Sequence, residues 1–236
     1  MEDKKEQNYN LLKKKAFDLG AHLFGVANTE PLKQRFLEIE GTYMDDLPYA
    51  ISLGFPLSKR ILKGIVDHPT KLYFFHYQRM NILIDTVTIK LTNIIQDMGY
   101  EALPIPSSQV IDWKEQKAHI SHKHVAKEAG LGWIGRNNLL VTKRYGSCLR
   151  LGTILTDIPL KADSPLDQDC GLCRRCLNVC PVNAIHESPA DFDHIACYEQ
   201  LKIFQKKHNI RHMICGICVK VCLGEFGKND KLSQKV

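Results

Sequence analysis

The chain carries four closely spaced cysteines in a pattern typical of iron–sulfur proteins. The segment CGLCRRCLNVCP places thiols at intervals of three, three and four residues and then ends in proline: Cys170, Cys173, Cys176, Cys180 and Pro181. A tight loop of this kind lets three thiolates bind three iron atoms of one [4Fe-4S] cubane, while the fourth thiolate binds a second cubane. The segment therefore predicts two clusters.

Four more cysteines complete the two predicted ligand sets. Cys215, Cys218 and Cys222 form a shorter return motif, and Cys197 stands upstream of it. Each cubane needs four thiolates, and the order of the motifs assigns Cys170, Cys173, Cys176 and Cys222 to one cluster and Cys180, Cys197, Cys215 and Cys218 to the other. A pair of zinc sites is the alternative, but zinc gives no role to the Cys-x-x-x-Cys-Pro ending. The ninth cysteine, Cys148, falls in a predicted strand and is expected to be a buried, inert thiol.

Composition indicates a globular protein. The 236 residues are 44% hydrophobic and 25% charged, enough to bury a core in one large domain or two small ones. There is no apolar run of eighteen residues, and the first residues, MEDKKEQNYN, lack the apolar stretch of a secretory signal. We therefore expect a cytoplasmic protein with no membrane partner. Nine cysteines in such a chain favour metal ligation over disulfide bonds.

Positive charge is concentrated at the carboxyl end. Residues 201–236 contain eight Lys or Arg and two acidic residues, so their net charge is 8 − 2 = +6, equal to that of the whole chain. Such a segment can dock RNA or an acidic electron donor. The alternative is a solvated face with a frayed tail.

Hydrophobic periodicity predicts a mixed α/β chain in two domains. Helices are expected near residues 4–19, 72–98 and 121–130, each ending at or before a glycine, and strands near 22–27, 49–57 and 101–106. Residues 138–142 and 150–160 flank KRYGS, which predicts a hairpin with Gly146 in its turn. The acidic segment 160–169 predicts a boundary, so that residues 1–160 form one domain and residues 161–236 form the cysteine domain.

One segment points to a known family. Residues 122–160, HKHVAKEAGLGWIGRNNLLVTKRYGSCLRLGTILTDIPL, resemble the cobalamin-dependent epoxyqueuosine reductases, which are related to reductive dehalogenases. The resemblance extends from YAISLGFPL, residues 49–57, through the cysteine region. It implies a nitroreductase-like domain that binds cobalamin or a related corrinoid, beside a ferredoxin-type domain with two [4Fe-4S] clusters. It also implies that the clusters reduce the cobalamin, which then acts on an electrophilic substrate.

The glycine-rich part of this segment suits contact with a flat macrocycle. Glycines at 130, 132 and 135 let the backbone approach closely, and Trp133 can cover an apolar face. The candidate cofactor-binding residues, including those that the resemblance adds, are Gly130, Gly132, Trp133, Arg136, Asn137, Asn138, Gly146, Ser147 and His76. The alternative is that AGLGW merely ends a helix and turns into a strand, and that His76 has a packing role.

The proton donor of the family is replaced in this chain. The family carries an aspartate thirteen residues before the position of Ala129, where this chain has Gln116, which cannot donate a carboxyl proton. Asp112 lies four positions earlier and would require a rearranged loop. We therefore take His119 as the first catalytic candidate, since the pKa of imidazole lies near neutrality, with Tyr77 as the second. The neighbouring His122 and His124 are expected at the surface.

The substrate stays open at this stage. The chain stops soon after the second cysteine motif, without the helical-repeat extension that epoxyqueuosine enzymes add for tRNA. A small-molecule or RNA-borne substrate is expected, with epoxyqueuosine in tRNA as one candidate and a ferredoxin- or flavodoxin-type protein as electron donor. The alternatives are an electron-transfer protein that reduces a corrinoid on a partner and a ferredoxin-like module without cobalamin.

Overall fold

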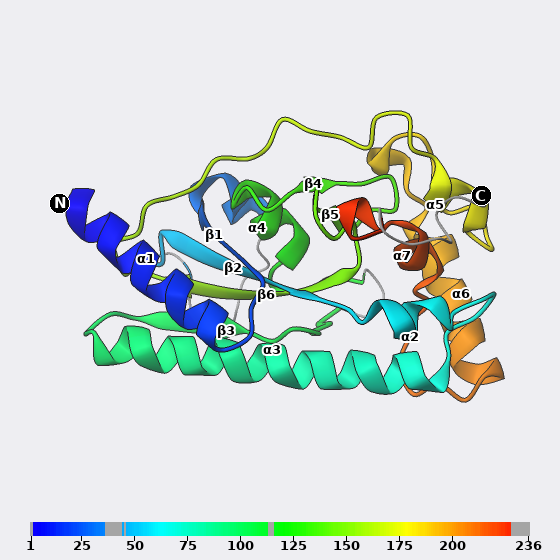
Figure 1. Ribbon diagram of the computed structural model, residues 1–236, viewed down its shortest axis with the longest axis horizontal. Helices are drawn as coiled ribbons and strands as arrows, with labels where there is room; N and C mark the ends of the chain where they lie inside the picture. Colours follow the sequence, from blue (N-terminus) through cyan, green and yellow to red (C-terminus); the bar gives the residue numbers. More distant parts are fainter. Residues whose placement is uncertain (1, 36–43, 45, 113–115, 228–236) are drawn as a thin grey trace. The chain divides into compact units, whose positions relative to one another are not determined.

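The computed structural model describes residues 2–35, 44, 46–112 and 116–227, which form two compact units (Figure 1). Unit 1 comprises Met1–Phe55, Asn81–Leu131 and Arg150–Leu166, and unit 2 comprises Pro56–Met80, Gly132–Leu149 and Asp167–Val236. The predicted mixed α/β class is confirmed. The last change of unit, at residue 166, lies near the boundary expected at residue 160, but unit 2 also takes in two earlier segments.

Unit 1 is built on a four-stranded sheet with the order β1-β2-β6-β3. The strands are β1 (Leu23–Asn28), β2 (Tyr49–Pro56), β6 (Leu149–Thr156) and β3 (Ala102–Ile105). β1 runs antiparallel to β2, and β3 runs antiparallel to β6. Six consecutive residues of β2 are buried, as expected of a strand that is covered on both faces.

Helices pack on this sheet through their apolar faces. α1 (Glu2–Asp18) buries Leu12 and Ala16 and sets the Tyr9 ring edge-on to Phe24 of β1, with ring centroids 5.2 Å apart. α4 (His122–Glu128) also contacts β1, and η1 (Glu30–Arg35) adds Leu32 to the same core. α3 (Lys71–Asp97) approaches β6 closely at Gly152, where an added Cβ would lie 2.8 Å from Ile84 Cγ2.

Unit 2 consists of short helices around a second core. Its elements are α2 (Lys59–Lys63), the first ten residues of α3, β4 (Trp133–Ile134), β5 (Leu140–Val141), α5 (Arg175–Val179), η2 (Pro189–Asp191), α6 (His194–Lys207), α7 (Ile217–Val221) and η3 (Gly224–Gly227). α7 contacts both α2 and α5. Cys148 is fully buried in this core, which confirms the expectation of a buried thiol.

The predicted hairpin of residues 138–142 and 150–160 is wrong. β5 pairs with β4, with Leu140 opposite Ile134, whereas β6 belongs to the larger sheet and pairs with β3. Gly146 does lie in a tight turn, at φ +57°, but the turn closes with an isolated bridge to Thr142. The turn signal was therefore real, and the strand partner was misassigned.

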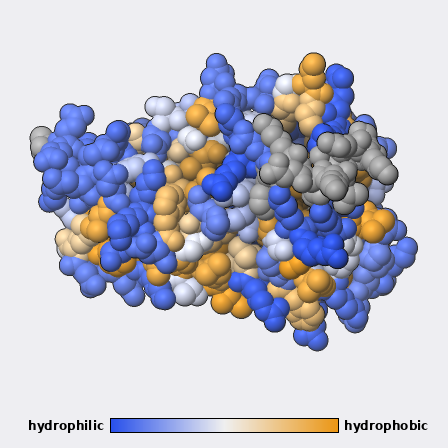
Figure 2. Space-filling view, viewed as in Figure 1, coloured by the Kyte–Doolittle hydropathy of each residue, from blue (hydrophilic) through white to orange (hydrophobic). Residues whose placement is uncertain are grey.

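Several apolar side chains lie on the outer side of α3. Ile82 and Ile89 are exposed by 66% and 52%. Figure 2 shows such hydrophobic side chains interspersed with hydrophilic ones along the lower edge, where α3 lies. Within the described ranges, no helix combines the length and apolar character needed to cross a membrane.

The two sides of α3 allow a matched test of the core of unit 1. Leu91 is fully buried, whereas Ile89 on the same helix is half exposed. Leu91→Ala should lower the free energy of unfolding by about 2–5 kcal/mol, because it leaves a cavity, and Ile89→Ala by less than about 1 kcal/mol. Denaturant unfolding of both variants measures this, and equal losses would contradict the packing of α3 described here.

Candidate functional site

The first cysteine loop leads directly into α5. Gly171 has a left-handed backbone at φ +52°, and its N–H donates to Asp169 Oδ1 at 2.6 Å. The N–H of Cys173 donates to the carbonyl of Cys170 at 3.1 Å, so the loop turns tightly before the helix starts. Cys176 lies within α5 and Cys180 at its end, which places the four thiols of the run on one compact turn and helix.

The return motif is organised by a second short helix. Gly216 has φ +82° at the start of α7, and a Cβ there would lie 2.7 Å from the Tyr73 ring. Glycine is therefore required for both the backbone conformation and the space. Cys218 lies within α7, and Cys222 follows it.

Several thiols of each predicted ligand set lie close enough to one another to influence each other's pKa. Burial raises the pKa of Cys176 to about 11, and Cys222, Cys170 and Cys173 raise it further. Burial likewise raises the pKa of Cys215 to about 11, with added contributions from Cys197 and Cys180. Cys218, whose pKa burial also raises, is near members of both sets. Among the described residues, no three potential ligands already stand in a metal-binding arrangement.

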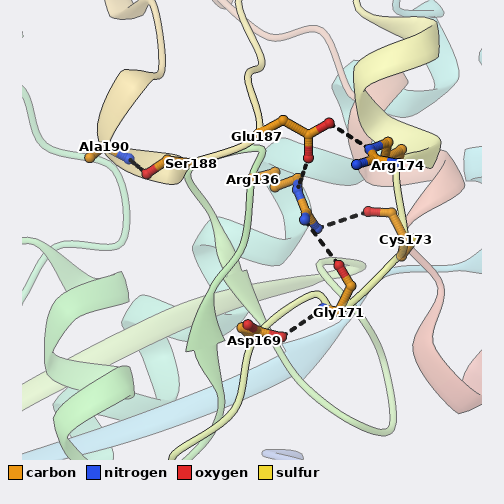
Figure 3. Close-up of polar contacts among 8 residues, drawn as sticks. All are labelled: Arg136, Asp169, Gly171, Cys173, Arg174, Glu187, Ser188 and Ala190. Atoms are coloured by element: carbon orange, nitrogen blue, oxygen red, sulfur yellow. Dashed lines mark hydrogen bonds and ion pairs between the residues drawn. The ribbon is translucent and has the colours of Figure 1, made fainter.

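Arg136 is hydrogen-bonded to the first cysteine loop (Figure 3). Its guanidinium donates to the carbonyls of Cys173 and Gly171, each at 3.0 Å, and to Glu187 at 3.2 Å. Arg174 binds the other oxygen of Glu187. The guanidinium of Arg136, a candidate cofactor-binding residue, is therefore engaged by the backbone of the first cysteine loop.

The turn after β5 makes hydrogen bonds to the backbone of Cys222. The carbonyl of Cys222 accepts from the backbone N–H of Ser147 at 3.0 Å and from the Cys148 thiol at 3.3 Å. Ser147 Oγ accepts from the buried amide of Asn137 at 3.1 Å. Burial raises the pKa of Cys222, and hydrogen bonds from Ser147 oppose that rise. Ser147 and Asn137 thus act together on a predicted cluster ligand.

The glycines of the AGLGW segment have packing reasons of their own. α4 ends before Gly130, which has φ +69°, and β4 begins at Trp133. A Cβ on Gly132 would lie 2.1 Å from the carbonyl of Val141, and one on Gly146 would lie 2.0 Å from that of Cys222. Asn138, at φ +56°, continues the turn. The local structure therefore agrees with the alternative that AGLGW ends a helix and turns into a strand. Trp133 Nε1 is buried without a hydrogen-bond partner among the described residues.

The segment around His119, the first catalytic candidate, belongs to unit 1. Asp112 and Lys117 exchange backbone hydrogen bonds of 3.0 and 3.2 Å, and Gln116 has φ +53°. Beyond this turn, His119 Nδ1 is buried with no hydrogen-bond partner among the described residues. Of the candidate site residues, only His119 and Gly130 lie in unit 1, and the rest lie in unit 2.

His122 and His124, which were expected at the surface, are partly buried, and both rings make hydrogen bonds. His122 Nε2 lies 3.0 Å from the carbonyl of Pro106 and Nδ1 lies 2.8 Å from Thr153 Oγ1. Because a carbonyl only accepts, Nε2 carries the proton and Nδ1 accepts from the hydroxyl. Burial lowers the pKa of His122 to about 4, and it does the same for His124. Both rings are therefore neutral at pH 7.

His76 and Tyr77 lie in the part of α3 that belongs to unit 2. His76 Nε2 accepts from the backbone N–H of Ser58 at 3.0 Å, and burial lowers its pKa. This contact supports the packing alternative for His76. Tyr77 packs against the core of unit 2, with its ring centroid 5.8 Å from that of His212.

Sequence reasoning missed two polar groups. Glu187 lies outside the cysteine motifs, and Arg174 lies between two cysteines without being a predicted ligand. Both complete the network around Arg136. In unit 1, Arg150 donates to Asn81 Oδ1 at 2.8 Å and to the carbonyl of Ser107 at 2.9 Å. These pairs join distant parts of the sequence, so local spacing gives no signal for them.

The fold and the cysteines together define a class: a mixed α/β chain with ferredoxin-type cysteine motifs. No protein-family model matches it. An epoxyqueuosine reductase of Synechocystis sp. is 40% identical over 113 residues, which cover 44% of this chain and 39% of that protein. An epoxyqueuosine reductase of Cyclobacterium marinum is 28% identical over 255 positions, covering 96% of this chain and 82% of that protein.

Solved structures share the fold. An epoxyqueuosine reductase crystallised with an epoxyqueuosine-modified tRNA-Tyr stem loop matches with a TM-score of 0.64 and 19% identity, over 96% of this chain and 67% of that one. A reductive dehalogenase whose structure suggests a mechanism for B12-dependent dehalogenation matches with a TM-score of 0.65 and 22% identity, over 78% and 26%. The predicted resemblance is confirmed: the chain is related to the epoxyqueuosine reductases. It spans about two fifths of the first curated relative's length.

His122 predicts a pH dependence of stability. Its pKa is depressed from 6.5 to about 4 in the fold, so its contribution is complete above pH 6.5 and is lost as the pH falls towards 4. Between pH 7.5 and 5.5 the wild-type protein should lose about 1 kcal/mol more unfolding free energy than His122→Gln. Denaturant unfolding at both pH values measures this, with the exposed His22→Gln as control. An identical pH dependence in wild type and His122→Gln would contradict the buried neutral ring.

Proposed function

We propose that this protein is a cobalamin- and iron–sulfur-dependent reductase of the epoxyqueuosine reductase type. The observation that supports the proposal is the proximity of Cys176 to Cys222, Cys170 and Cys173, and of Cys215 to Cys197 and Cys180, in a chain that is related to these reductases. The proposed functional division is a nitroreductase-like corrin-binding domain over residues 1–160 and a ferredoxin-like domain over residues 161–236.

The donor set fits two [4Fe-4S] clusters. Thiolates are the ligands that such clusters use, and gathering several ionised thiols in one buried place is unfavourable without a metal to neutralise them. The proposed sets are Cys170, Cys173, Cys176 and Cys222 for one cluster and Cys180, Cys197, Cys215 and Cys218 for the other. Cys148 is excluded, because its thiol already donates to the carbonyls of Val219 and Cys222.

The proposal for cobalamin rests on the buried ring nitrogen of Trp133. Trp133 Nε1 has no hydrogen-bond partner among the described residues, and a buried polar atom of this kind normally finds one. Amide or phosphate oxygens of a corrinoid would provide such a partner. When bound, cobalamin supplies a reducible cobalt centre that can act on an electrophilic carbon or oxygen. Gly130, Gly132, Asn138 and Gly146 shape the adjoining turns, while Arg136, Asn137 and Ser147 support the cysteine loops.

The favoured substrate is epoxyqueuosine in tRNA. Curated relatives carry the name epoxyqueuosine reductase, one of them over 82% of its length, and one solved relative holds a modified tRNA stem loop. The basic residues of α6, together with Arg211 and Lys220, would attract a phosphate backbone. Lys228, Lys231 and Lys235 lie outside the described residues. Converting the epoxide to an alkene consumes two electrons and two protons and releases water.

The chain must also supply protons. His119 is the proposed donor, since the ring nitrogen Nδ1 is not engaged by other described residues. The presence of Gln116 in place of the family aspartate also favours a second candidate, a reductase of the same chemistry with a different electrophile. In both cases a low-potential protein of ferredoxin or flavodoxin type would deliver the electrons.

Iron analysis tests the ligand sets. The reconstituted wild-type protein should contain about eight iron atoms per chain. Cys222→Ser should lose about one cluster of iron, because a hydroxyl replaces a thiolate ligand, whereas Cys148→Ser should keep the wild-type content. A wild-type value of about four atoms would refute the two-cluster assignment, and loss of iron in Cys148→Ser would refute its exclusion.

Cobalamin retention tests the enzyme. Protein reconstituted anaerobically with hydroxocobalamin should keep the cofactor through gel filtration, as seen in its visible spectrum. His119→Gln should keep cobalamin yet lose reduction of an epoxyqueuosine-containing tRNA stem loop, because it removes the proton donor, while the exposed His186→Gln should leave both unchanged. Release of cobalamin from the wild type would overturn the proposal. Unchanged turnover in His119→Gln would assign the proton to another group.

A further inference from the structure

The guanidinium of Arg136 is fully engaged by the first cysteine loop (Figure 3). Each of its three nitrogens has a partner: Nη1 the carbonyl of Cys173, Nη2 the carbonyl of Gly171, and Nε the Glu187 carboxylate. The side chain is only 15% exposed. A planar fork that binds two carbonyls at once fixes their spacing and direction, so Arg136 sets the path of the backbone on both sides of residue 172.

The loop has few other contacts that could hold it in place. The Leu172 side chain is 93% exposed, and Cys173 is also exposed. A Cβ on Gly171 would meet nothing within 4 Å. Besides Arg136, the hydrogen bonds from Gly171 N–H to Asp169 and from Cys173 N–H to the carbonyl of Cys170 restrain this turn. Since apolar packing does not fix the loop, its order depends on charged and polar partners.

Arg136 shares its carboxylate partner, Glu187, with a second cation. Glu187 accepts from Arg136 and also from Arg174, whose Nε lies 2.5 Å from the second carboxylate oxygen. Hydrogen bonding to Arg174 lowers the pKa of Glu187, and Arg136 adds to the effect. Two cations therefore share one carboxylate beside Cys173, and Asp169 adds a second carboxylate to the loop at Gly171. The guanidinium of Arg136 is the positive charge that binds directly to the carbonyl of a predicted iron ligand.

We propose that Arg136 is a positioning residue for the cluster of Cys170, Cys173, Cys176 and Cys222, and that its fixed charge raises the reduction potential of that cluster. The inference rests on the proposed function, because it needs the cluster to be present. One-electron reduction adds a negative charge to the cluster, and a nearby, poorly solvated cation stabilises the reduced form. The fork to the two carbonyls holds the Cys170–Cys173 turn in the shape that receives iron.

Three substitutions separate the two effects. Arg136→Gln removes both the fork and the charge. It should speed iron loss to a chelator about tenfold, as expected for the loss of charge-assisted hydrogen bonds, and it should lower one of the two midpoint potentials. Arg136→Lys keeps the charge without the fork, so iron loss should be faster while both potentials stay near wild type. Glu187→Gln removes the compensating charge, so the same midpoint potential should rise.

The measurements are chelator-challenge kinetics and a potentiometric titration followed by electron paramagnetic resonance. The control is Arg144→Gln, which removes an exposed charge from the same unit and should change neither. Wild-type iron retention and potentials in Arg136→Gln would overturn the inference, as would equal shifts in Arg144→Gln. If Arg136→Gln assembles no cluster, Arg136→Lys and Glu187→Gln still decide the charge effect. A wild-type protein without clusters would instead refute the proposed function.

Discussion

Unit 2 brings several cysteine thiols close together in buried surroundings. Burial raises the pKa of these thiols, and each neighbouring thiol adds to the rise, as at Cys176 and Cys215. Such a cluster of like groups does not hold itself together in the absence of metal. The surrounding chain therefore supplies the order: left-handed glycines at 171 and 216 make the turns, and short helices fix the spacing that follows them.

Part of the segment that carries the family resemblance also supports the cysteine loops. Residues 132–149 belong to the same unit as the cysteine loops, and three of their side chains serve those loops. Arg136 binds the carbonyls of the first loop, while Asn137 and Ser147 act on Cys222. Hydrogen bonds and charges around the ligands are known to set cluster potentials. The glycine-rich segment, whose composition suits contact with a macrocycle, therefore also supports the ligands of a proposed cluster.

The sequence predicted the long elements well and the pairing of short ones poorly. The helix predicted at 72–98 is α3, because its apolar period runs for many turns and ends at Gly99. The strand partner of residues 138–142 was wrong, because alternation identifies a strand but not its neighbour: β5 pairs with β4 through only two residues. Cysteine spacing predicts the proposed ligand sets because cluster geometry constrains the spacing of ligands, whereas the Arg136–Glu187 pair depends on residues 51 positions apart that no local pattern connects.

His119, His122 and His124 lie within six residues of one another. They have the same side chain, but their different surroundings give them different chemistry. His122 uses both ring nitrogens for hydrogen bonds with Pro106 and Thr153, so replacing this residue would affect the stability of the fold. His124 bonds Ser121, and its pKa is about 4 because burial and the nearby Lys123, Arg35 and Lys127 disfavour a further charge. A ring held neutral in this way carries few protons to donate at pH 7. His119 has a buried Nδ1 that no described residue binds, which is why it is the proposed proton donor of the three.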